Sequence, residues 1–159
     1  MERERAGRGE FRHFTTLTTR WSDNDSYGHL NNVVYYELFD SAVNAALIDA
    51  GLLDVERSPA VGLVAETGCR YFEPLAFPEA VEAGVRVERI GRSSVRYAIA
   101  IFRQDAAQAA AQGHFVHVYV DRQTRRPVAV PDDVRRFLEA LQSPGSEAGG
   151  AALGADGQA

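Results

Sequence analysis

Sulfur is scarce in this sequence. Of 159 residues, a single one is cysteine, Cys69. One thiol excludes an internal disulfide framework and a cysteine-rich metal site, because each needs several cysteines. A lone thiol fits a reducing compartment. Cys69 lies in a run of strand-forming residues without a local nucleophile signature, so it is expected to be a buried strand thiol.

Long apolar runs are also missing. No run reaches the about 18 to 20 residues that a membrane-spanning helix needs, so no membrane partner is expected. Residues 1–10 are rich in Arg, Glu and Gly and lack the apolar core of a signal peptide. These two absences make the cytoplasm the expected location.

Positive charge is not in excess either. The formal net charge is −5 at pH 7, which does not favour nucleic acid as a partner. Two histidines, His114 and His117, have the spacing of a partial metal site, but no third ligand lies nearby in the sequence. Strand alternation would also put them on opposite faces, so no metal is expected.

The composition is otherwise that of a globular domain, with 45% apolar and 25% charged residues. A chain of this length is expected to form one domain with a real core. We expect that domain over residues 12–142. Residues 1–11 and 143–159 have little to bury and are expected to be disordered tails.

The segment from Val33 to Ala50 has the pattern of a long helix. Its polar positions recur three or four residues apart and therefore share one face, while the remaining positions are apolar or small. A helix that apolar must be wrapped by other structure on most sides. Gly51 supplies the stop signal. The polar positions are Glu37, Asp40, Ser41 and Asn44.

Strand-forming runs surround this helix in the sequence. Several alternate apolar and polar residues with a period of two. Residues 103–112 fit either a hairpin connection or a helical turn, and residues 131–141 begin with a helix start signal. The resulting fold class is α+β, with an antiparallel sheet that curls around one helix. The strand-forming runs are 14–19, 62–72, 81–88, 95–101 and 115–120.

The most informative segment runs from Arg20 to Tyr35 and ends where the apolar helix begins. It gathers a carboxylate (Asp25), an imidazole (His29) and two carboxamides. A helix start offers free backbone N–H groups and a partial positive charge. This combination is typical of a reaction site more than of a surface loop.

The same segment resembles the active-site segment of hotdog-fold thioesterases, the group that includes 4-hydroxybenzoyl-CoA thioesterases and plant acyl-ACP thioesterases. The matching pattern is Asp25-x-x-Gly28-His29-x-Asn31-Asn32-x-x-Tyr35, preceded by Arg20-Trp21-Ser22-Asp23. The resemblance implies a hotdog fold and hydrolysis of an acyl-CoA or acyl carrier protein thioester. It also implies a homodimer or homotetramer with active sites shared across the interface, and no cofactor beyond the coenzyme A of the substrate.

The resemblance implies roles for three residues. Asp25 would act as nucleophile or as general base for water; the ordinary alternative is a carboxylate that caps the following turn. The backbone N–H of Asn32, seven residues later, would hold the thioester oxygen as it gains charge. His29 would orient Asp25, donate to the carbonyl or protonate the thiolate, or it is a structural histidine of the loop.

Other residues are candidates for substrate binding. Tyr27 and Tyr35 could form pocket walls, although both would be ordinary core aromatics. Glu66, on the second expected strand, is a secondary carboxylate candidate if it faces the helix. Arginine suits phosphate, so the phosphates of coenzyme A could be held near the turn that starts at Arg122. The full set of candidates is Tyr27, Gly28, Asn31, Tyr35, Glu66, Ser93, Ser94 and Arg122.

Two other functions compete with thioester hydrolysis. A non-catalytic acyl-CoA-binding module would bind the same ligand without turnover. A hotdog hydratase or dehydratase would resemble the pattern Asp-x-Asn-Pro-x-His, with Asp and His five residues apart. Here Asp25 and His29 are four apart and no proline lies between them, which ranks that alternative low.

Overall fold

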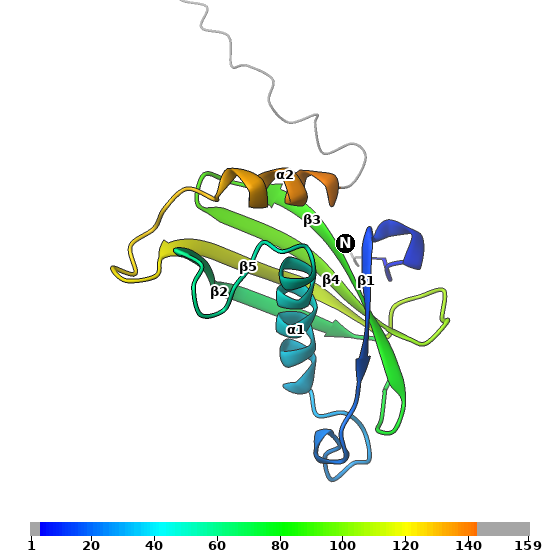
Figure 1. Cartoon of the computed structure of the whole chain (residues 1–159). Coiled ribbons are helices and arrows are strands. Elements are labelled where there is room, and N and C mark those ends of the chain that lie inside the picture. Colours follow the sequence, from blue (N-terminus) through cyan, green and yellow to red (C-terminus); the bar gives the residue numbers. More distant parts are fainter. Residues whose placement is uncertain (1–3, 143–159) are drawn as a thin grey trace, which may run out of the picture.

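The computed structural model describes residues 4–142, so the tail expected at 143–159 lies outside the described residues. A five-stranded antiparallel sheet curls around one long helix (Figure 1). The strand order is β1-β3-β4-β5-β2, which leaves β1 and β2 at the two edges. The strands are β1 (His13–Thr18), β2 (Ala60–Tyr71), β3 (Ala80–Ile90), β4 (Ser94–Arg103) and β5 (Ala111–Asp121).

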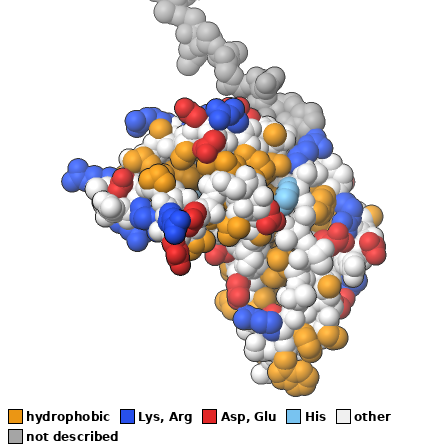
Figure 2. Space-filling view, in the orientation of Figure 1, with side chains coloured by type: hydrophobic (Ala, Val, Ile, Leu, Met, Phe, Trp, Pro, Cys, Tyr) orange, Lys and Arg blue, Asp and Glu red, His pale blue; other side chains and the backbone are white. Residues whose placement is uncertain are grey.

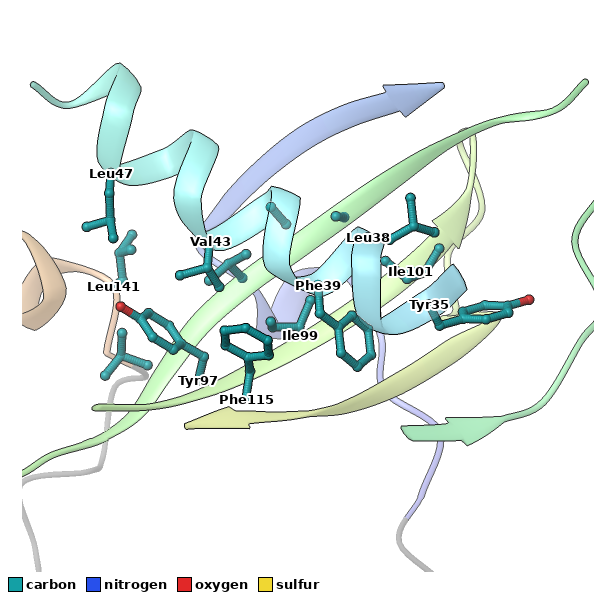
Figure 3. Close-up of a cluster of buried hydrophobic side chains, with 14 of the residues drawn as sticks. Tyr35, Leu38, Phe39, Val43, Leu47, Tyr97, Ile99, Ile101, Phe115 and Leu141 are labelled. Carbon is teal, nitrogen blue, oxygen red and sulfur yellow. The ribbon is translucent and has the colours of Figure 1, made fainter. Parts of the chain in front are cut away.

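Helix α1 (Val34–Asp49) fills the hollow of the sheet. It begins and ends within one residue of the expected bounds. Phe39 and Ala42 are fully buried, whereas the expected polar face, with Glu37 and Asp40, is exposed. Figure 3 shows the residues that α1 presents to the sheet, and aromatic and aliphatic side chains of β4 and β5 that meet them. The expected α+β arrangement is therefore confirmed.

The ambiguous segment 103–112 is a hairpin connection. Strand β4 continues to Arg103 and β5 starts at Ala111. A second helix, α2 (Asp132–Ala140), begins one residue after Pro131, as its start signal predicts, and lies against β3. Among residues 4–142, neither helix combines the length and apolarity that crossing a membrane demands.

His114 and His117 lie on opposite faces of β5, as strand alternation predicts. The His117 ring packs against Tyr97 and Phe115 in the core, with ring centroids 5.7 and 4.9 Å away. Burial lowers the pKa of His117 to about 4. His114 instead lies 2.7 Å from Glu66 on the outer face. A paired metal site on β5 is therefore excluded by geometry.

The N-terminal segment corrects one expectation. We expected residues 1–11 to be a disordered tail, but residues 4–11 pack on the outer face of the sheet. Ala6 and Phe11 are 7% and 6% exposed, and Arg8 binds Glu82 of β3 at 3.1 Å. A short 3₁₀ turn, Arg8–Glu10, leads into β1. Ala6 and Phe11 are enough to hold this segment against the sheet, because small residues of the sheet leave room for their side chains. Residues 1–3 lie outside the described range.

Gly113 marks the closest approach of β5 to its neighbours. A Cβ there would overlap the carbonyl oxygen of Gly68 on β2 and lie 2.9 Å from Phe39 Cε2. We expect G113A to lower the free energy of unfolding by about 1 to 3 kcal/mol, because a backbone oxygen cannot move aside cheaply. Chemical denaturation measures it. G9A is the matched control, since a Cβ at Gly9 meets nothing within 4 Å. Equal stability of G113A and wild type would contradict this packing.

The buried His117 predicts a pH dependence of stability. Its pKa is about 4 in the folded chain against a reference value of 6.5. As the pH falls from 6.5 to 4, the unfolded chain binds a proton that the folded chain does not, so stability falls. We expect a loss of about 3 kcal/mol across this window. Denaturation of wild type and H117L at several pH values measures it; parallel profiles would show that burial does not hold His117 neutral.

Candidate active site

The loop between β1 and α1 is held at its base by an ion pair. Asp23 is 3% exposed and lies 3.0 Å from the Arg20 guanidinium. The Arg20 backbone N–H also donates to Asp23 Oδ2 at 2.7 Å. Across the loop, the Asn31 N–H donates to the Asp23 carbonyl at 2.8 Å. The pairing of Asp23 with Arg20 and the bond from Asn31 therefore anchor both ends of the loop.

Asp25 and His29 close a tight turn within this loop. The Asp25 N–H donates to the His29 carbonyl at 2.8 Å, and the Gly28 N–H donates to the Asp25 carbonyl at 3.1 Å. Gly28 has a φ of +83°, which a glycine adopts without strain. Asp25 Oδ1 accepts the Tyr27 N–H at 2.8 Å. Asp25 thus caps the turn with one of its oxygens, which is the ordinary role that the sequence analysis set beside the catalytic one.

The structure brings the three expected catalytic residues to one open cavity of about 600 Å³. Asp25 and His29 line it from the loop, and Asn32 lines it from the turn just before α1. Tyr27, at its rim, is 86% exposed, and Tyr35, at its floor, is 3% exposed. Gly28 supplies the turn and does not line the cavity. The remaining lining residues are Leu30, Tyr71, Phe72, Glu73 and Pro74.

The backbone N–H groups that precede and begin α1 are only partly paired within the described residues. Asn31 accepts the Val34 N–H on its carbonyl at 2.9 Å and the Val33 N–H on Oδ1 at 3.1 Å. Asn31 is therefore a structural residue of the turn. Within residues 4–142, the Asn32 N–H has no acceptor. A free N–H beside a helix start can hold a developing negative charge.

Strand β2 contributes a residue that the sequence did not single out. The Tyr71 hydroxyl donates to the Asn32 carbonyl at 2.9 Å, and its ring meets Tyr35 edge to face at 5.0 Å. Desolvation raises the pKa of Tyr71 above its ordinary value. Tyr71 ties the end of β2 to the turn that carries the Asn32 N–H. Its sequence signal, a tyrosine at a strand end, is too common to have identified it.

Glu73 is the second carboxylate of the cavity, and two arginines compensate its negative charge. Arg5 and Arg103 lie 2.5 and 3.3 Å from its oxygens. The hydrogen bond from Arg5 is the main cause that lowers the pKa of Glu73. Asp25, by contrast, forms no ion pair within residues 4–142. A base or nucleophile needs an available lone pair, so Asp25 is the better candidate.

Glu66 is not part of this site, which corrects the idea that it faces the helix. Its side chain is 62% exposed and pairs with His114 and Arg96 on the outer face of the sheet. The β2–β5 register shifts between Val64 and Glu66. A bulge there interrupts the alternation of faces and turns Glu66 outward.

The candidates for phosphate binding lie away from the Asp25 cavity. Ser93 and Ser94 lie at the hairpin between β3 and β4, where the Ser93 carbonyl accepts the Tyr119 N–H at 2.7 Å. Arg122 donates to the carbonyls of Ser58 and Val55 at 2.6 and 2.7 Å. Arg122 therefore supports the loop before β2 within its own chain.

Exposed aromatic residues mark the tip of the loop. Trp21 is 83% exposed and contacts Phe77 edge to face at 6.1 Å. Figure 2 shows apolar side chains gathered at the lower end of the molecule, where Figure 1 places this loop. Among residues 4–142, no group of three or more His, Cys, Asp or Glu side chains is arranged to hold a metal ion.

Comparisons with known proteins agree with this geometry. The family model of the thioesterase-like superfamily matches residues 19–138. Among curated proteins, none matches this chain. The chain is similar to the structure of the PA5185 protein from Pseudomonas aeruginosa, with 50% identity and a TM-score of 0.86 over 89% of this chain and 99% of that one.

Two further structures share the fold. A predicted thioesterase from Bacillus stearothermophilus is 27% identical, with a TM-score of 0.69 over 83% of this chain and 98% of that one. The DHNA-CoA thioesterase from Staphylococcus aureus is 21% identical, with a TM-score of 0.69 over 80% and 86%. The chain therefore belongs to the thioesterase-like superfamily and is a hotdog-fold thioester hydrolase.

Proposed function

We propose that this protein hydrolyses an acyl-CoA thioester to a free carboxylic acid and a thiol, with Asp25 as nucleophile or general base. The observation that carries the proposal is that one cavity is lined by both Asp25 and Asn32, and that the Asn32 N–H has no acceptor within residues 4–142. Such a site supplies both halves of the reaction, a group that attacks or activates water and a donor for the carbonyl oxygen.

The carbonyl oxygen binds at the start of α1. As the thioester carbon is attacked, its oxygen gains negative charge. The Asn32 N–H stabilises this charge, and the partial positive charge of the α1 N-terminus adds to the attraction. The Tyr71 hydroxyl holds the turn by its bond to the Asn32 carbonyl at 2.9 Å, so the donor is fixed before the substrate binds.

Two routes use the Asp25 carboxylate. In one, the carboxylate attacks the carbonyl carbon, the C–S bond breaks with release of thiolate, and water then hydrolyses the resulting anhydride. In the other, Asp25 takes a proton from water, and the hydroxide formed attacks the carbonyl. In both, the thiolate leaves easily because a thiol has a pKa near 8.5. His29 lines the same cavity and can supply the proton that the thiolate takes up.

The working form is a homo-oligomer built on the free edge of β2. Leu63 and Val64 near the middle of this edge strand are 41% and 48% exposed. An exposed apolar strand edge is a template for pairing with another chain. Coenzyme A is the favoured carrier, since an acidic carrier protein would need a basic surface and the net charge of this chain is −5.

Replacement of Asp25 tests the assigned role. We expect D25N to lower kcat for acyl-CoA hydrolysis by at least about 100-fold, because the amide neither attacks nor takes a proton. Thiol release from a panel of acyl-CoAs measures this. D40N is the matched control, since Asp40 is an exposed carboxylate of α1 that contacts Asn44. A D25N enzyme that keeps most of its activity would show that the assignment is wrong.

Replacement of Tyr71 tests the support of the oxyanion donor. Y71F removes one hydrogen bond to the Asn32 carbonyl, and we expect kcat to fall about 3- to 10-fold with little change in KM. A change in kcat without a change in KM distinguishes a positioning role from a role in substrate binding. A Y71F enzyme with wild-type kcat and a lower melting temperature would instead assign Tyr71 a purely structural role.

A further inference from the structure

The N-terminal segment reaches the Asp25 cavity through one side chain. This segment runs beside the connection between β4 and β5 (Figure 1), where the Ala109 N–H donates to the Ala6 carbonyl at 3.0 Å. From there the Arg5 side chain extends to Glu73, and the two approach to 2.5 Å. Since Glu73 lines the cavity, a segment that precedes the whole sheet in the sequence contacts the wall of the site.

Three contacts hold the Arg5 side chain at this wall. Its Nε donates to the Ala109 carbonyl at 2.6 Å, and its Nη2 pairs with Glu73 Oε1. Its guanidinium carbon also lies 5.8 Å from the centre of the Phe72 ring. Phe72 and Glu73 are neighbouring lining residues of the cavity. The place of this positive charge is therefore fixed before a substrate binds.

Arg5 is the main counter-charge of Glu73. Arg103 also approaches Glu73, at 3.3 Å, but its closest carboxylate is that of Glu79, at 2.6 Å. Arg103 donates in addition to the Pro74 carbonyl at 3.0 Å. In agreement, the hydrogen bond from Arg5 is the largest cause that lowers the pKa of Glu73. The two arginines and two glutamates together carry no net charge, and loss of Arg5 would leave one negative charge at the wall.

A net negative charge at this wall would act against the proposed substrate. Coenzyme A carries a pyrophosphate and a phosphomonoester, so it is a polyanion. Its phosphates stay in water, because their burial without counter-charges is costly, and they therefore lie at the open side of the cavity. Salt screens charges over about 10 Å at 0.1 M ionic strength. A charge on Glu73, which is 40% exposed in a cavity of about 600 Å³, therefore acts on the phosphates.

We propose that Arg5, acting through Glu73, makes the cavity receptive to a thioester with a polyanionic carrier. Arg5 is a positioning residue, since it offsets a charge of the wall and takes no part in the chemical step. The inference rests on the proposed function, because it concerns the approach of an acyl-CoA to the same site. It implies that Arg5 discriminates between charged and uncharged carriers of one acyl group.

Two substrates with the same acyl group test this role. Hexanoyl-CoA carries the phosphates, whereas hexanoyl-pantetheine has the same thioester and no charge. We expect R5Q to lower the ratio of kcat/KM for hexanoyl-CoA to kcat/KM for hexanoyl-pantetheine by about 3- to 10-fold at low ionic strength. The effect should vanish at about 0.5 M salt. The loss should lie in KM, because the phosphates are the same in the bound substrate and in the transition state.

Two further variants decide whether charge is the cause. R5K keeps a positive charge at the same place, so its ratio should stay near that of wild type. R5Q/E73Q removes the charges of both partners, so it should restore the ratio although the ion pair is lost. A ratio that stays low in either variant would overturn the proposal, because the loss would then follow from missing contacts of the N-terminal segment.

R8Q is the matched control. Arg8 belongs to the same segment, donates from Nε to the Ala106 carbonyl at 2.9 Å and pairs with Glu82 at 3.1 Å. Its replacement removes the same charge and the same kinds of contact, but neither partner lines the Asp25 cavity. R8Q should keep the wild-type ratio. A fall as large as that in R5Q would overturn the proposal, because it would show an effect of overall charge or of the segment as a whole.

Failure of the proposed function would look different from failure of this inference. In the first case, wild type would release no thiol from either substrate, or D25N would remain active on both. In the second case, D25N would be inactive on both substrates, while R5Q would show the ratio of wild type. The proposed function would then stand, and the role of Arg5 would be overturned.

Discussion

Helix α1 is apolar on every side but one, and its apolar sides can be buried only if the sheet curls around it. Phe39, Ala42 and Val43 of α1 are at most 1% exposed, and their partners come from β3, β4 and β5. The packing of α1 inside the sheet fixes the position of the helix N-terminus next to the Asp25 cavity. The packing that buries the core therefore also sets the position of the Asn32 N–H, which has no acceptor within residues 4–142, and the loop of Asp25 lies beside it.

Ion pairs with arginine distinguish the carboxylates around the loop that carries Asp25. Asp23 is paired with Arg20 and serves the loop base, while Glu73 is shared between Arg5 and Arg103 and joins the N-terminal segment to the end of β2. Asp25 lies between them, yet it accepts only a backbone N–H. Two of these carboxylates are held by arginines and Asp25 is not, so their ion-pair partners, not their residue type, distinguish them.

Local patterns were readable from the sequence, and long-range ones were not. The period of α1, the Asp25–His29 turn and the opposite faces of His114 and His117 each depend on a few neighbouring residues. Tyr71 joined the site because β2 runs antiparallel to α1, which no local pattern reveals. Glu66 was misplaced because a single-residue bulge reversed the faces of β2. The N-terminal segment looked featureless because Phe11 packs over Gly84, a contact set by the fold.

The free edge of β2 has a consequence for the homo-oligomer proposed above. If such an oligomer shares its active sites across the interface, as the family resemblance implies, its dissociation would separate the two halves of each site. Mass action would then govern the activity, so the specific activity would fall on dilution and would depend on protein abundance as well as on the shape of one subunit.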